Sequence, residues 1–148
     1  MKGLARFLSL APLERRFLLK TALLLGAAEV SLHVFSLERV RHLLATLSRV
    51  LTGRCSAPPS AGQIVRAARV AGRHLPWVGS CLTQALVVQA LFHRWGYPAH
   101  LRIGIARGEQ GQFQAHAWLQ DHSGVVIGGR ELGRYAYTPL PPLEGEQP

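Results

Sequence analysis

Cysteine is scarce in this sequence, and the shortage excludes one class of protein. Cys55 and Cys81 are the two cysteines among 148 residues, too few for the disulfide framework that stabilises small secreted domains. The N-terminus also lacks a long apolar core followed by a small-residue cleavage site, so no signal peptide is expected. Both absences favour a cytoplasmic chain with free thiols.

Long uninterrupted apolar runs are also missing. The most apolar stretch, residues 17–35, is interrupted by Lys20, Glu29 and His33. The span between its two charged residues is too short to cross a bilayer. The sequence therefore predicts no transmembrane helix, although a helix with weak contact to a membrane surface fits the pattern.

Acidic residues are few, eight against seventeen Lys and Arg, which gives a formal charge of +9. Such an excess is typical of proteins that meet nucleic acid, anionic lipid or an acidic partner. No nucleic-acid-binding motif occurs, and no basic run is interleaved with aromatics, so nucleic acid is not an expected partner. Seven of the eight carboxylates are glutamates and one, Asp121, is an aspartate, which limits the catalytic triads that this chain can build.

What is present is a chain that can bury a core, because 48% of its residues are hydrophobic. Apolar residues recur every three or four positions between residues 12 and 50, which predicts two or three helices. We expect an N-terminal helical region over residues 1–56 and a second domain over residues 57–148. The arginines of the first region, Arg39 and Arg41 among them, are either solvated or dock an acidic partner.

The region after Gly79 is the most informative part of the chain. Ser80 is a good N-cap, and apolar residues follow it at helical spacing as far as Trp95. Gly96 then suits the left-handed position that ends a helix. This pattern places Cys81 in the first turn of a mostly buried helix.

Alternating side chains predict strands over residues 99–106 and 113–120. The second strand places His116 and Trp118 on one face and its small and apolar residues on the other. The segment D-H-S-G (121–124) is an expected hairpin turn, and V-V-I-G-G (125–129) is the expected return strand. In this register Gln120 pairs with Val125, and His116 pairs with Gly129.

Cys81 and His116 form a candidate catalytic pair. Unpaired N–H groups and the dipole at a helix N-terminus favour a thiolate, and the same groups stabilise an oxyanion. A thiolate also needs an imidazole as base and acid, and His116 is the best placed of seven histidines, with His100 second. The alternative is that Cys81 is a small packed residue and His116 a structural one. No histidine or cysteine pair has metal-ligand spacing, so neither a metal nor another cofactor is expected.

Three runs carry a family resemblance: C-L-T-Q-A-L (81–86), L-R-I-G (101–104) and A-H-A-W (115–118). In this order and spacing, with the turn and V-V-I-G-G after them, they resemble the lasso peptide leader peptidases. These are the transglutaminase-like biosynthesis B proteins of bacterial ribosomal peptide gene clusters. The resemblance covers about residues 60–140 and implies an α+β, papain-like/transglutaminase-like core, with the nucleophile helix packed on an antiparallel sheet.

The same resemblance implies a function. The chain would be a cysteine peptidase that removes the leader from a lasso precursor peptide, with Cys81 as nucleophile and His116 as base and acid. A small leader-recognition protein would deliver the precursor, and an ATP-dependent cyclase would close the ring. Trp118 and Ser80 are candidate substrate-binding residues. A transglutaminase-type acyltransferase and a non-catalytic scaffold of the same fold are the alternatives.

The third member of the triad is where this sequence departs from the family, which is described with an aspartate after the A-H-A-W strand. Asp121 would lie about 17 Å along the strand from His116 and on the other face. Glu131 shares the face of residue 129 in the expected register and is the favoured orienter. A backbone carbonyl or a glutamine is the alternative. The expected docking surface for the leader and its recognition protein combines the Arg-rich helices with the sheet beside His116.

Overall fold

The computed structural model describes residues 11–53, 57–75, 80–133 and 135–142; the side chains of Arg130 and Glu131 are not described. Within these ranges the chain forms helices and one sheet, so the α+β class is confirmed. The elements are α2 (Pro12–Leu32), α3 (Leu37–Thr52), α4 (Ala61–His74), α5 (Cys81–Arg94), β1 (His100–Arg107), β2 (Phe113–Asp121), β3 (Gly124–Ile127), α6 (Gly129–Leu132) and β4 (Thr138–Pro139).

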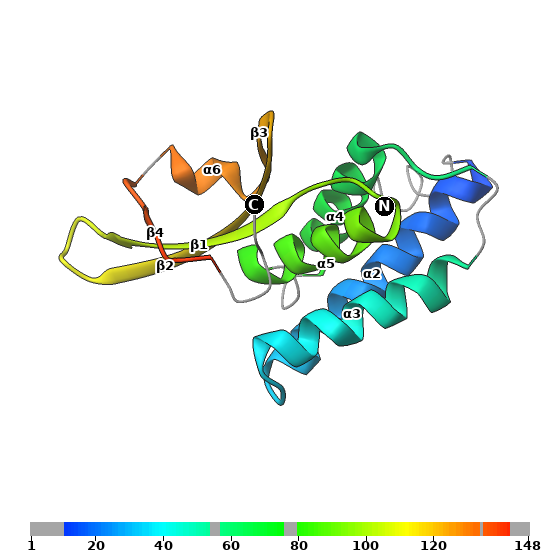
Figure 1. Cartoon of the computed structure of the whole chain (residues 1–148), viewed down its shortest axis with the longest axis horizontal. Coiled ribbons are helices and arrows are strands. Elements are labelled where there is room, and N and C mark those ends of the chain that lie inside the picture. The colour runs from blue at the N-terminus through cyan, green and yellow to red at the C-terminus, as the bar shows by residue number, and fades with distance from the viewer. Residues whose placement is uncertain (1–10, 54–56, 76–79, 134, 143–148) are drawn as a thin grey trace.

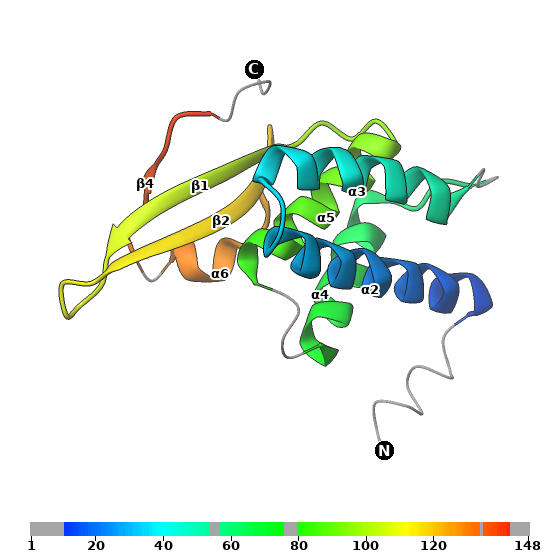
Figure 2. The same cartoon turned by 90° about the horizontal axis from the view of Figure 1, so that it is seen from below.

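The long helices gather at one end of the molecule, and the hairpin of β1 and β2 extends from them to the other end (Figure 1). Helices α2 and α3 lie side by side as an antiparallel pair, and both pack on α5 (Figure 2). One apolar core joins these helices to α4 and to the inner face of the sheet. It includes Leu24, Leu25, Val40, Leu44, Ile64, Leu86, Leu91, Leu101 and Leu119.

Capping residues explain where two helices begin. Ser60 and Gln63 form a reciprocal capping box at the start of α4. Ser80 accepts a hydrogen bond from the Thr83 N–H at the start of α5, as the sequence predicts. Beyond the C-terminus of α5, Gly96 has a φ of +74°, the left-handed conformation expected there.

The sheet has the strand order β3-β2-β1-β4 and is antiparallel throughout. Ala117 and Leu119 belong to the core that β2 shares with α5. Because side chains alternate along a strand, His116 and Trp118 project from the opposite face. The predicted separation of these residues between the two faces is confirmed.

The expected register of the return strand is wrong beyond its first pair. Gln120 pairs with Val125 as expected, but a bulge shifts the next pair to Leu119 and Ile127. The strand ends at Ile127, Gly128 adopts a φ of +90°, and Gly129–Leu132 is a short helix. The predicted pairing of His116 with Gly129 is therefore not formed, because one extra residue in β3 and a left-handed glycine turn the chain away.

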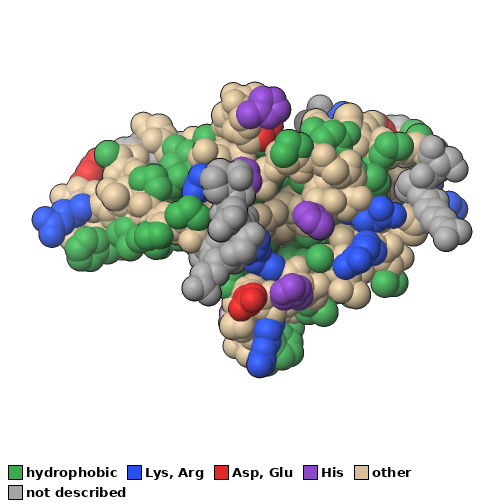
Figure 3. Space-filling view, viewed as in Figure 1, with side chains coloured by type: hydrophobic (Ala, Val, Ile, Leu, Met, Phe, Trp, Pro, Cys, Tyr) green, Lys and Arg blue, Asp and Glu red, His purple; other side chains and the backbone are tan. Residues whose placement is uncertain are grey.

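Lys and Arg side chains are spread over the helical end of the molecule, with few acidic side chains between them (Figure 3). None of the helices in the described ranges combines the length and the apolar character that crossing a membrane requires.

Candidate active site

Cys81 occupies the first turn of α5, where the sequence places it. Its thiol is free and half-buried against the apolar core. The backbone N–H groups of the first turn of a helix lack intrahelical partners, so a thiolate there has hydrogen-bond donors and the positive end of the helix dipole beside it. The position suits a nucleophile.

A chain of hydrogen bonds ties this first turn to α2. The Thr83 hydroxyl donates to a Glu29 carboxylate oxygen at 2.6 Å. Its single proton is thereby used, so the Ser80 hydroxyl donates to Thr83 Oγ1 at 2.8 Å. Ser80 Oγ in turn accepts from the Thr83 N–H at 3.2 Å. Thr83 is fully buried, so this network holds the Cys81 turn in place from a helix that is distant in sequence.

His116 is buried in β2, with 4% of its surface exposed. Its Nε2 lies 2.6 Å from the carbonyl oxygen of Gly128. A carbonyl only accepts, so Nε2 carries a proton and donates it. In the neutral ring the basic lone pair is then on Nδ1. The backbone thus selects the tautomer of this histidine. A backbone carbonyl as the partner of the imidazole is one of the alternatives that the sequence leaves open.

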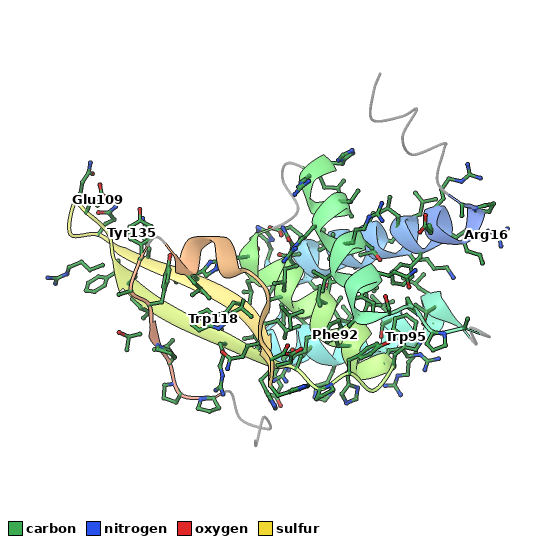
Figure 4. All side chains as sticks on the ribbon, turned by 90° about the horizontal axis from the view of Figure 1, so that it is seen from above. Arg16, Phe92, Trp95, Glu109, Trp118 and Tyr135 are labelled. Carbon is green, nitrogen blue, oxygen red and sulfur yellow. The ribbon has the colours of Figure 1, made fainter. Side chains whose placement is uncertain are left out.

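Aromatic rings cover the His116 side of the sheet. The Trp118 ring stacks on the imidazole, with centroids 6.2 Å apart and planes 18° apart. The Tyr137 ring packs against both, at 5.3 Å from His116 and 6.5 Å from Trp118. Trp118 also donates its Nε1–H to Gln120 Oε1 at 3.1 Å. In Figure 4, Trp118 lies over the sheet, well apart from Phe92 and Trp95 among the helices.

Two glycines make this packing sterically possible. Gly104 pairs with His116 across the sheet, and a Cβ there would lie 2.9 Å from the Trp118 ring. At Gly128 a Cβ would lie 2.8 Å from the Ala117 carbonyl oxygen and 2.9 Å from the Trp118 Cα. Neither position has room for a side chain, and Gly128 also needs its positive φ.

The structure does not join Cys81 and His116 directly. Helix α5 packs on the face of β2 that carries Ala117 and Leu119, whereas His116 projects from the other face. Figure 1 shows α5 and α6 on different sides of β1 and β2. Both residues lie in the described ranges, and no hydrogen bond links them there.

The carboxylates proposed as orienters lie in different settings. Asp121 Oδ1 accepts hydrogen bonds from the hydroxyl and N–H of Ser123 and from the Gly124 N–H. The Ser123 hydroxyl is the largest of the causes that hold the pKa of Asp121 below its usual value. That carboxylate stabilises the hairpin turn. Glu131 lies in α6 rather than on a strand, and its side chain falls outside the description, so its role stays a prediction.

Two features of this region have no signal in the sequence. Tyr137 lies outside every motif, and the hydrogen bond from Thr83 to Glu29 joins residues 54 positions apart. Gly128 offered a signal, because glycine next to a strand end often marks a bulge or a turn. Among the described residues no three His, Cys, Asp or Glu side chains cluster as a metal site.

Comparison with known families decides the assignment of the fold. A model of the transglutaminase-like superfamily matches residues 22–141, most of the chain. The chain belongs to the transglutaminase-like superfamily. No curated protein and no solved structure matches it.

Membership of the superfamily supports a cysteine-dependent site in general terms, without specifying the reaction. Proteins of the transglutaminase-like superfamily are commonly cysteine-dependent enzymes. The match begins within α2 and extends past β4, so it spans both Cys81 and His116. It also runs across residue 56, where the sequence places the end of the helical region. The division there stays a prediction.

Proposed function

We propose that this transglutaminase-like chain is a cysteine peptidase that removes the leader from a lasso precursor peptide. The observation that carries the proposal is the buried His116, fixed as the Nε2–H tautomer by the Gly128 carbonyl. A histidine held in one tautomer at a buried position suits proton transfer, and Cys81 at the start of α5 suits nucleophilic attack.

In the proposed reaction the Cys81 thiol gives its proton to Nδ1 of His116, and the thiolate attacks the scissile carbonyl carbon. N–H groups of the first turn of α5 stabilise the oxyanion. The tetrahedral intermediate then collapses, the C–N bond breaks, and Nδ1–H protonates the leaving amine. Water, deprotonated by the same nitrogen, attacks the thioester and releases the carboxylic acid and the thiol.

The step that this reaction requires is an approach of Sγ to Nδ1. Hydrogen bonds between nucleophile and base are often long or misaligned without substrate and tighten in the complex. We propose that bound precursor, delivered by the leader-recognition protein, changes how the first turn of α5 and the His116 part of β2 lie relative to each other, so that Sγ reaches Nδ1. The Gly128 carbonyl is the proposed orienter of the imidazole, with Glu131 as the alternative.

The proposed partners rest on the family resemblance of three runs, which begin at Cys81, Leu101 and Ala115. They are the precursor leader, a small leader-recognition protein and an ATP-dependent lasso cyclase, and the compartment is the cytoplasm. Trp118 and Ser80 remain proposed substrate-binding residues. Trp118 is 5% exposed and its ring lies against Tyr137, so a substrate reaches the ring only after a local rearrangement.

The deciding experiment incubates precursor and leader-recognition protein with the full chain or with single variants. Cys81→Ala and His116→Ala are expected to release no leader within the detection limit of mass spectrometry, whereas the matched cysteine control Cys55→Ala cleaves like the wild type. Leader release by Cys81→Ala at the wild-type rate would sink the proposal.

The superfamily match supports a second chemistry, acyl transfer to an amine through the same thioester. Mass spectrometry separates the two, because hydrolysis adds water and transfer adds the amine. A scaffold role predicts instead that iodoacetamide alkylates Cys81 no faster than Cys55.

A further inference from the structure

A cleft of about 530 Å³ opens between α4 and the hairpin of β2 and β3. It contains neither Cys81 nor His116. Its lining combines apolar side chains with three arginines. These residues include Val65, Phe92, Val126, Arg66, Arg69 and Arg73.

The three arginines form one exposed stripe along α4. Their spacing of three and four residues places them on the same helical face, over about 10 Å at 1.5 Å per residue. Helix α4 itself carries no acidic residue. Asp121 is the one carboxylate among the described residues that line the cleft, and its Oδ1 is engaged by Ser123 and Gly124. One carboxylate against three guanidinium groups leaves the lining of the cleft with a net positive charge.

The opposite wall of the cleft is the edge of the sheet. β3 is the outermost strand on this side, and the Val126 carbonyl points toward α4, where it accepts a hydrogen bond from Arg69 Nη2 at 3.2 Å. One guanidinium is thereby positioned at a strand edge. Between this wall and α4 the floor is apolar.

We propose that this cleft binds an acidic peptide segment in extended conformation, independently of the chemistry at Cys81. In an extended segment alternate side chains lie about 6.6 Å apart on one side. Two or three carboxylates at alternate positions therefore match the 10 Å stripe of Arg66, Arg69 and Arg73. Intervening apolar side chains point the other way, toward Val126 on the opposite wall.

The same geometry disfavours other anions. A single phosphate is too small to contact guanidinium groups spread over about 10 Å. Single-stranded nucleic acid needs exposed aromatic faces for base stacking, and Phe92, the aromatic residue of the lining, is 2% exposed. A linear carboxylate-bearing segment fits both the length and the apolar floor.

The test uses fluorescence anisotropy with a fluorescein-labelled nonapeptide of alternating Glu and Val, and its Gln-Val counterpart. The protein is the full chain carrying Cys81→Ala, so binding is read without turnover. Replacing Arg66, Arg69 and Arg73 together by Gln is expected to weaken binding of the Glu peptide about tenfold. The charge-matched control replaces Arg16, Arg49 and Arg107, which are exposed and outside the cleft, and should change affinity by less than about twofold.

Thermal unfolding of both triple variants checks that they fold. If the triple variant of Arg66, Arg69 and Arg73 does not fold, the single variant Arg73→Gln replaces it in the binding measurement. Equal weakening by the two triple variants would show that net charge alone attracts the peptide. Equal affinity for the Gln peptide, no binding of the Glu peptide, or its displacement by stoichiometric single-stranded DNA would each overturn the proposal. Because no cleavage is measured, none of these outcomes bears on the proposed peptidase.

Discussion

Gly128 meets two separate requirements at one position. Its φ of +90° favours glycine, and its α-carbon lies so close to β2 that a Cβ would overlap the Ala117 carbonyl and the Trp118 backbone. Its carbonyl also fixes the tautomer of His116. A residue that sequence reading treats as part of a strand thus becomes the one that sets which imidazole nitrogen is basic.

Replacing Gly128 by Ala is expected to lower leader cleavage about tenfold or more, because the displaced carbonyl no longer holds the Nε2–H tautomer. It should also cost about 1 kcal/mol or more of stability. The measurements are the cleavage rate and urea unfolding.

Gly111→Ala is the matched control, since Gly111 has a similar φ of +82° with nothing within 4 Å of an added Cβ. It should lose stability but keep its cleavage rate. Equal rates for Gly128→Ala and Gly111→Ala would contradict the orienting role of the Gly128 carbonyl.

At the scale of elements, α2 fixes the start of α5. Glu29 lies near the C-terminal end of α2, and its carboxylate accepts the Thr83 hydroxyl, which in turn accepts from Ser80. The start of α5 is therefore held both by its own N-cap residue, Ser80, and by a contact with another helix. Such a network holds the turn of Cys81 more rigidly than an N-cap alone.

Thr83→Val removes this link while keeping the shape of the side chain. We expect a loss of about 1–2 kcal/mol in the free energy of unfolding, because a buried hydrogen bond to a carboxylate is lost. Thr83→Ser keeps the hydroxyl and should lose less stability than Thr83→Val. The control is Thr46→Val, whose hydroxyl bonds the His42 carbonyl on the exposed side of α3; a loss as large as that of Thr83→Val would refute the network.

At the scale of the whole molecule, the N-terminal helices share their core with the rest of the chain. Leu24 and Leu25 of α2 and Val40 and Leu44 of α3 belong to the same buried cluster as α5 and the sheet. The helical region is thus part of what stabilises α5.

A chain consisting of residues 57–148 is expected not to fold cooperatively, because removing α2 and α3 exposes the apolar surface of α5. Thermal unfolding followed by near-UV circular dichroism, with the full chain as control, measures this. A cooperative transition of the fragment close to that of the full chain would instead support an independent domain from residue 57.

Sequence periodicity and caps determined much of this protein by themselves. The helix over Cys81–Arg94 with its cap at Ser80, the first-turn position of Cys81 and the shared face of His116 and Trp118 all follow from local patterns. Each depends on neighbours within a few residues, for which spacing is informative.

Tertiary structure decided what local patterns do not contain. A bulge opposite Leu119 and Gln120 shifts the register of β3 by one residue, and the strand then ends at Ile127. The left-handed Gly128 turns the chain at that point and places its carbonyl, rather than a paired Gly129, at His116. The packing of Tyr137 on His116 and the hydrogen bond between Thr83 and Glu29 likewise join segments that are distant in the sequence. Strand pairing and side-chain packing select among registers that the alternation pattern alone leaves equivalent, so these contacts form only when the whole chain packs.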